Sequence, residues 1–156
     1  MATHSFTARK SLSLERCQKI RLALMNIDTW PSWNSAMSSM LATGAGLLKE
    51  GYYLAHHSVL KGSLIESQWH IEEIREAKNF LEIIMLMIGQ TRNEKPIAKG
   101  IGNFRLCITV LEEEDGGVEI HSKWDTVGMG RLFHRSINSY AKKSTQLLLD
   151  DLCTIV

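Results

Sequence analysis

The segment GMGRLFHRSINSYAKKSTQLLLDDLCTIV, residues 128–156, contains no proline and no glycine after Gly130. Its apolar residues recur at spacings close to i, i+3, i+4 and i+7, which places them on one face of a helix. They are Met129, Leu132, Phe133, Ile137, Tyr140, Ala141, Leu147, Leu148, Leu152 and Ile155. The segment therefore predicts a long amphipathic helix from Met129 to Val156, about 40 Å in length.

Most of the chain before this helix has the pattern of β-strands. In residues 63–75, Ile65, Trp69 and Ile71 share one parity and mostly charged or polar residues take the other, which indicates one dry and one wet face. Similar runs predict strands at 4–11, 36–43, 52–60, 63–75, 80–88, 100–112 and 118–125. Several of the connections are short, hairpin-type turns, so neighbouring strands are expected to be antiparallel.

Two helices are expected after the first strand. Ser13 can cap a helix over residues 14–27, and Pro31 suits the first turn of a short second helix. The pattern predicts a single α+β domain over residues 1–156. In it, a curved antiparallel sheet of about seven strands wraps around the long C-terminal helix.

The segment Ile27-Asp28-Thr29-Trp30-Pro31-Ser32-Trp33-Asn34, the glycine-containing loop 44–51, Trp69 in a middle strand, Trp124 in a late strand and the final helix occur in a particular order. This order resembles the START-like superfamily, which includes birch-pollen-type allergens, polyketide cyclases and dehydratases, lipid-transfer domains and coenzyme Q-binding proteins. The resemblance covers nearly the whole chain. It implies a helix-grip fold with a hydrophobic tunnel between the sheet and the terminal helix.

Two interpretations exist for the residues that the strand and helix patterns point inward. They fill a core, as apolar stripes usually do, or they line the tunnel that the resemblance implies and contact a flat apolar ligand. The expected ligand-binding residues are Trp30, Trp33, Trp69, Ile71, Met85, Met87, Phe104, Leu106, Ser122, Trp124, Met129, Phe133 and Ser136.

The expected catalytic residues are His57 and Tyr140. His56 and His57 are adjacent on a strand, so only one can face inward, and Tyr53, Ala55 and Val59 share the parity of His57. An inward imidazole can serve as a general base or a hydrogen-bond donor. A surface histidine or one hydrogen-bonded within the core is the alternative.

No cofactor or metal is expected from the sequence. The histidines lack metal-site spacing, and the glycines near residue 100 lack the strand and helix context of a dinucleotide site. The formal net charge is +1, with lysines and arginines spread along the chain, so no nucleic-acid partner is predicted.

The expected location is the cytoplasm. The three cysteines form no CxxC pair, and no apolar run reaches the ~18 residues of a membrane span. We therefore expect no membrane insertion.

The run 80–88 is apolar on both faces apart from Glu82. If Glu82 faces water, then Phe80, Ile84, Leu86 and Ile88 form an outward apolar strip. Either the protein's own loops cover this strip, or a second copy does and the protein is a homodimer.

The sequence predicts binding of a small hydrophobic molecule in an internal cavity. The first hypothesis is a biosynthetic enzyme similar to polyketide cyclases and dehydratases, acting by positioning and acid/base catalysis. The alternative is a carrier or sensor of a lipid, isoprenoid or other apolar ligand. If the catalytic pair points to solvent and the cavity is wholly apolar, the carrier is favoured.

Overall fold

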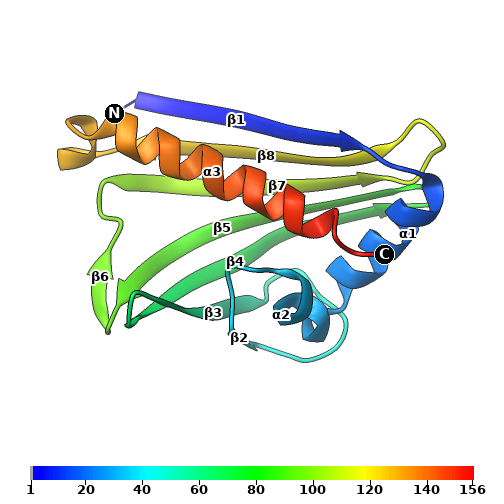
Figure 1. Cartoon of the computed structure of the whole chain (residues 1–156), viewed down its shortest axis with the longest axis horizontal. Helices are drawn as coiled ribbons and strands as arrows, with labels where there is room; N and C mark the ends of the chain where they lie inside the picture. The colour runs from blue at the N-terminus through cyan, green and yellow to red at the C-terminus, as the bar shows by residue number, and fades with distance from the viewer. Residues whose placement is uncertain (1) are drawn as a thin grey trace.

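A computed structural model describes residues 2–156 (Figure 1). Its antiparallel sheet has the order β1-β8-β7-β5-β4-β3-β2, and the short strand β6 pairs with the end of β5. The elements are β1 (Ala2–Ser11), α1 (Leu14–Met25), η1 (Ile27–Thr29), α2 (Trp30–Trp33), β2 (Ser39–Ala42), β3 (Tyr53–Leu60), β4 (Ser63–Ala77), β5 (Phe80–Arg92), β6 (Lys95–Ile97), β7 (Ile101–Leu111), β8 (Gly117–Thr126), η2 (Gly128–Arg131) and α3 (His134–Leu152).

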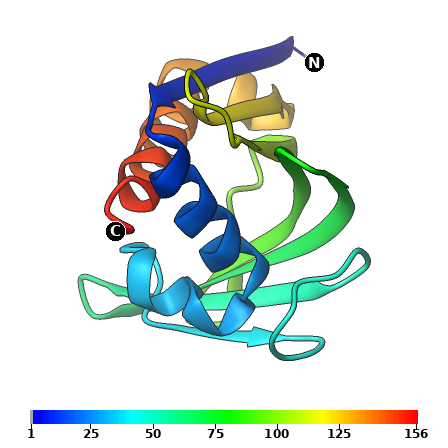
Figure 2. The same ribbon diagram turned by 90° about the vertical axis from the view of Figure 1, so that its right-hand side faces the viewer.

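The sheet curves around α3, with α1 and α2 closing one end of the enclosed space (Figure 2). Register shifts interrupt the pairing of β4 with β5 at two places, and one interrupts the pairing of β7 with β8. Such bulges bend a strand and increase its twist, so they let long strands wrap around a helix. The predicted helix-grip arrangement is confirmed, with one strand more than expected.

The additional strand is β6, which lies between the strands predicted at 80–88 and 100–112. Asn93 and Glu94 have φ angles of 48° and 70° and form the two-residue turn between β5 and β6. Positive φ at both central residues is the conformation of a type I′ turn. The sequence pattern did not predict this strand because it contains Pro96, but a short edge strand such as β6 tolerates proline.

Buried and more exposed side chains alternate along β4 and β5, as predicted. Ile71, Leu81 and Ile83 are completely buried on the inner face. On the outer face of β5, the strip made of Phe80, Ile84, Leu86 and Ile88 is half-buried to exposed. The homodimer through this strip stays a prediction.

The long helix begins later than predicted. Residues 128–131 form the 3₁₀ turn η2, and α3 begins at His134. Gly130 lies directly against Gly100: a side chain at Gly130 would come within 2.6 Å of the Gly100 Cα. This contact holds the segment as a turn outside the helix. As a result Met129 and Phe133 are 68% and 61% exposed, and their predicted inward orientation is wrong.

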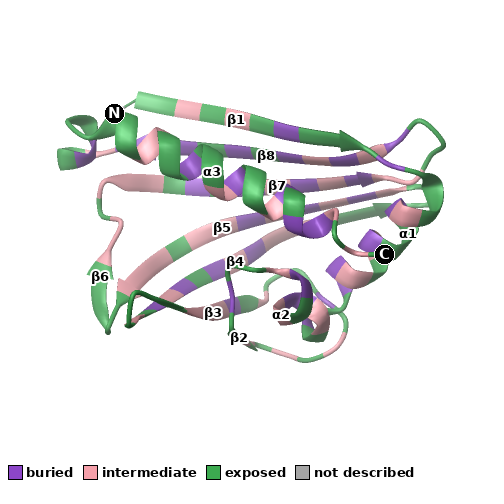
Figure 3. Ribbon diagram, in the orientation of Figure 1, coloured by how far each residue is buried: buried purple, intermediate pink, exposed green. Residues whose placement is uncertain are grey.

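One face of α3 packs against the sheet (Figure 3). Its members are Ala141, Thr145, Leu149 and Leu152, at most 2% exposed and spaced three or four residues apart. Leu147 and Leu148 lie outside this face, because the aliphatic run 147–149 spans more than one face of the helix. The remaining apolar residues of the helix are free to line the space below it.

The two short helices begin at residues suited to that position. The Ser13 side chain accepts a hydrogen bond from Arg16 N at 3.3 Å, so the predicted cap is confirmed. Pro31 lies in the first turn of α2, as expected. Within residues 2–156, no helix is long and apolar enough to cross a membrane.

Candidate functional site

A cavity of about 520 Å³ lies between α3 and the inner face of the sheet. Pockets of roughly 300–1,000 Å³ are typical for small-molecule ligands. The lining comes from α3, β3, β4, β5, β7, the segment that follows α2 and the segment around β6. It consists of Asn34, Ala36, His56, Ser58, Leu60, Ile65, Ser67, Trp69, Met87, Gln90, Arg92, Ile97, Ala98, Gly100, Ile101, Phe104, Leu106, Ser136, Ile137, Tyr140, Ser144, Leu147, Leu148 and Asp151.

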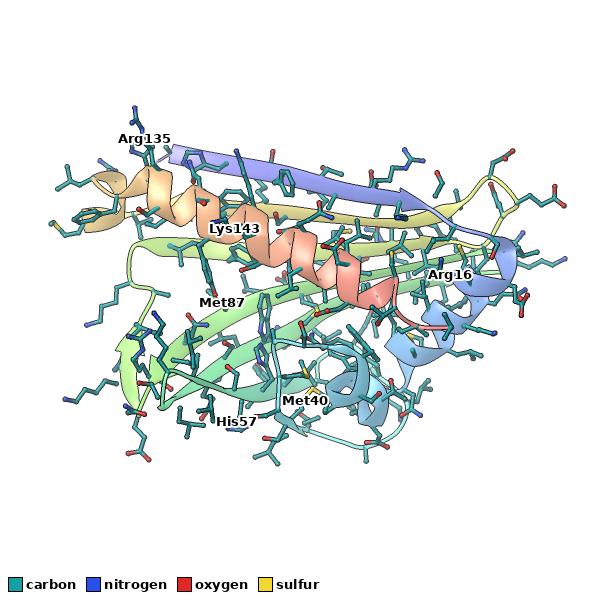
Figure 4. The ribbon with its side chains drawn as sticks, in the orientation of Figure 1. Arg16, Met40, His57, Met87, Arg135 and Lys143 are labelled. Atoms are coloured by element: carbon teal, nitrogen blue, oxygen red, sulfur yellow. The ribbon has the colours of Figure 1, made fainter. Side chains whose placement is uncertain are left out.

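The deep wall is apolar and brings together four residues expected from the sequence: Trp69, Met87, Phe104 and Leu106. The rings of Trp69 and Phe104 meet edge to face, with centroids 5.9 Å apart. Met87 points from β5 toward the space under α3 (Figure 4). Aromatic rings give this wall flat surfaces, and the flexible thioether can adapt to different ligand shapes.

His56 is the histidine that faces the cavity. It follows the buried Leu54 by two residues on β3 and pairs with Ser67 of β4, so its side chain lies on the inner face. Its Nδ1 is buried and has no hydrogen-bond partner among the described residues. Burial, and then the neighbouring His57, lower the pKa of His56 to about 4. The ring is therefore neutral at pH 7, and Nδ1 donates or accepts according to the tautomer.

His57 lies on the outer side of β3, away from α3 (Figure 4). Its Nε2 is 3.5 Å from Glu66 Oε2. The inward orientation predicted for His57 is wrong because the parity was taken from Tyr53 and Val59, which are 56% and 67% exposed. Those two residues lie on the outer face, and Leu54 sets the inner one.

Further polar groups surround the cavity. Gln90 Nε2 donates to Ser67 Oγ at 2.9 Å. At the other end, the buried Asp151 accepts hydrogen bonds from Ser35 N at 3.0 Å and from Ser35 Oγ at 2.8 Å. These groups satisfy one another and keep their shape without a ligand. The His56 Nδ1 differs from them because it lacks a partner.

Tyr140 and Ser136 line the cavity from α3. Tyr140 is half exposed, so it borders both solvent and the cavity. Arg92, which is also exposed, lines the cavity from β5. Within residues 2–156, no cluster of three or more His, Cys, Asp or Glu side chains is placed to hold a metal ion.

Three expected ligand residues lie behind the wall. Ile71, Ser122 and Trp124 are fully buried and do not line the cavity. Trp124 stacks on Phe104 with centroids 6.0 Å apart, and its Nε1 donates to Asn138 Oδ1 at 2.9 Å. It therefore supports the Phe104 ring from behind.

Three further expected residues border a separate small void. Trp30, Trp33 and Met85 line a space of about 60 Å³ that also touches His56 and Trp69. The indole nitrogen of Trp30 is satisfied by the Leu24 carbonyl oxygen at 3.0 Å. This void extends the site behind His56. Met129 and Phe133 border neither space.

Sequence reasoning missed the cavity-facing side of α3. Ser136, Ile137, Tyr140, Ser144, Leu147, Leu148 and Asp151 recur at three- and four-residue spacing and all line the cavity. The helical period contains this signal. It was hidden because two serines and an aspartate interrupt the apolar stripe, and only Ser136 and Tyr140 were selected from the set.

No protein-family model matches the sequence. A search of curated proteins finds no match either. Solved structures, in contrast, superpose over nearly the whole chain.

Ara h 8.0201 superposes with a TM-score of 0.61 and 10% identity, covering 98% of this chain and 99% of that one. This chain has the helix-grip fold. The Zhui aromatase/cyclase from Streptomyces sp. R1128 gives a TM-score of 0.58 at 6% identity, with 97% and 90% of the chains covered. Norcoclaurine synthase from Thalictrum flavum, in complex with dopamine and hydroxybenzaldehyde, gives 0.57 at 14%, with 96% and 88% covered.

Proposed function

We propose that this protein binds a small hydrophobic molecule carrying one hydroxyl or carbonyl group. The apolar body would lie against Trp69, Phe104 and Met87, and the polar group would bond to His56. The observation that carries the proposal is a cavity of about 520 Å³ bordered by His56, whose buried Nδ1 has no hydrogen-bond partner among the described residues.

A buried polar atom without a hydrogen bond costs about 1–3 kcal/mol, which a ligand recovers when it supplies the missing partner. Since the lowered pKa keeps the ring neutral, this partner need not carry a charge. The site therefore favours a neutral polar group on an apolar skeleton over a plain hydrocarbon.

The test compares 2-naphthol with naphthalene, which differ by one hydroxyl. Binding is followed by quenching of tryptophan fluorescence. We expect the wild type to prefer 2-naphthol by about tenfold, from one recovered hydrogen bond. His56→Leu should bind both compounds with equal affinity, whereas His57→Leu should keep the preference.

Two results would contradict the proposal. Binding of neither compound would refute ligand binding at this site, and an unchanged preference in His56→Leu would refute the role of His56. Far-UV circular dichroism of each variant shows that it is folded, so a loss of binding is not a loss of structure.

A cyclase or dehydratase activity is the second candidate, because His56 and Tyr140 border one cavity from opposite walls. In an aldol cyclisation, His56 would take a proton from the carbon beside a carbonyl, and that carbon would attack a second carbonyl of the same substrate. The imidazolium would then return the proton to the new alkoxide. In dehydration the ring would take a second α-proton and give it to the departing hydroxyl, which leaves as water.

The pKa of His56 weighs against this second candidate. A general base acts best when its pKa lies near the working pH, and a value of about 4 makes the ring a weak base in the empty cavity. The discriminating measurement is turnover of a linear polyketone analogue. If the wild type cyclises the analogue and both His56→Leu and Tyr140→Phe lose this activity, catalysis is supported. If the analogue cyclises no faster with the wild type than without protein, binding alone is supported.

A further inference from the structure

Exposed apolar side chains gather at the end of the molecule where η2 begins. Met129, Leu132 and Phe133 are 61–72% exposed, and Val59 and Leu60 are exposed at the turn between β3 and β4. Figure 1 shows η2, β6 and this turn at the same end of the long axis. Large apolar residues grouped in this way mark an interaction surface.

The same end is basic. Lys61, Arg92, Lys95, Lys99, Arg131 and Arg135 are all exposed here. Among the described residues none of the six forms an ion pair, and Arg135 projects outward beside η2 (Figure 4). The acidic residues in these turns are Glu66, which pairs with His57, and Glu94.

The opposite end carries both signs of charge. The turn between β7 and β8 contains Glu112, Glu113, Glu114 and Asp115. Lys10 lies beside this turn at the end of β1, and Arg21 of α1 forms ion pairs with Glu76 and Glu112. Because the formal net charge of the chain is only +1, the positive potential of the first end comes from its local cluster of six cations and not from an overall excess of positive charge.

The cavity extends to this end. Leu60, Arg92 and Ile97 line the cavity from the sheet side, and Ser136 lines it from the start of α3. Gly100 lines the cavity and also contacts Gly130 of η2, which connects the cavity wall to the apolar turn. A partner seated on the apolar and basic residues would thus lie next to residues that line the cavity.

We propose that this end docks on the surface of an anionic lipid bilayer, from which the apolar ligand enters. The apolar side chains of η2 and the β3–β4 turn would enter the interfacial region, and the six cations would face lipid headgroups. A bilayer fits this surface better than a protein groove does, because the exposed apolar residues lie on two separate projections, around η2 and at the β3–β4 turn. This contact is peripheral and needs no membrane-spanning helix.

The test is co-sedimentation with vesicles of phosphatidylcholine alone or mixed with phosphatidylserine. The protein should sediment with the mixed vesicles, and higher salt should weaken the binding. Arg131→Gln with Arg135→Gln should reduce the affinity about 25-fold, since each lost cation weakens attraction about fivefold. Lys78→Gln, at the opposite end, should leave it unchanged.

The apolar part has a matched control. Leu132 on the proposed surface and Leu22 on α1 are each 72% exposed. Leu132→Glu should abolish vesicle binding, and Leu22→Glu should not. Both sites are at the surface, so both variants are expected to fold.

The remaining outcomes contradict the proposal. Equal effects of the two leucine variants, or failure of the wild type to bind mixed vesicles, would overturn it. Failure to bind vesicles together with a dimeric mass in light scattering that Leu132→Glu reduces to a monomer would assign the surface to a second copy instead.

Discussion

The stability of the protein should fall in mild acid because of one histidine. The pKa of His56 is lowered from 6.5 to about 4 in the folded protein, first by burial and then by the adjacent His57. In the unfolded chain the ring has its ordinary pKa. Between these two values the unfolded state binds a proton that the folded state does not, so protonation favours unfolding.

The size of the effect follows from the shift. A difference of about 2.5 pKa units at about 1.4 kcal/mol per unit gives roughly 3 kcal/mol. This contribution is absent above pH 6.5, where both states are neutral, and it destabilises the protein progressively as the pH falls toward 4. The loss is complete once the pH is below the folded-state pKa.

The assay is urea unfolding at several pH values between 7 and 4, comparing the wild type with His56→Leu. The variant should lack this part of the acid destabilisation, and its stability at neutral pH should be similar or higher because it buries no unpartnered nitrogen. His134→Gln removes an exposed histidine and should keep the wild-type dependence. Parallel losses in wild type and His56→Leu, or an NMR pKa of His56 near 6.5, would refute the reasoning.

Three further predictions concern packing and assembly. Gly130→Ala should destabilise the fold by about 2–3 kcal/mol in urea, because the new methyl group would meet the backbone of Gly100. Asp151→Ala should cost a similar ~2–3 kcal/mol in urea, since it removes two hydrogen bonds to Ser35 and leaves a backbone N–H unpaired. If the outer strip of β5 joins two copies, light scattering should give a dimeric mass that Ile84→Glu converts to a monomer.

The two stability predictions have control variants, and the homodimer prediction has a result that would contradict it. Gly89→Ala adds a methyl group with no atom within 4 Å and should change stability little. Asp150→Ala removes an exposed carboxylate one residue from Asp151 and should cost much less than Asp151→Ala. A monomeric wild-type mass at high protein concentration would remove the homodimer prediction.

The sequence alone was sufficient to predict the fold because its apolar residues follow two periods, that of a β-strand and that of an α-helix. Trp69 and Ile71 alternate with polar neighbours, and the terminal segment repeats at helical spacing, so each element carries its own buried face. A curved sheet and one long amphipathic helix leave few ways to bury both faces. The positions of Trp69, Met87, Phe104 and Leu106 in the cavity wall follow from the same alternation.

Only the tertiary structure decided which polar groups face the cavity. On β3 the local pattern is ambiguous, since Tyr53 and Val59 are apolar yet exposed, and the pairing of His56 with Ser67 settles the orientation. The start of α3 depends on the distant contact between Gly100 and Gly130. Period and parity are local properties of a chain, whereas the direction of an isolated histidine and the end of a helix depend on neighbours far along the sequence.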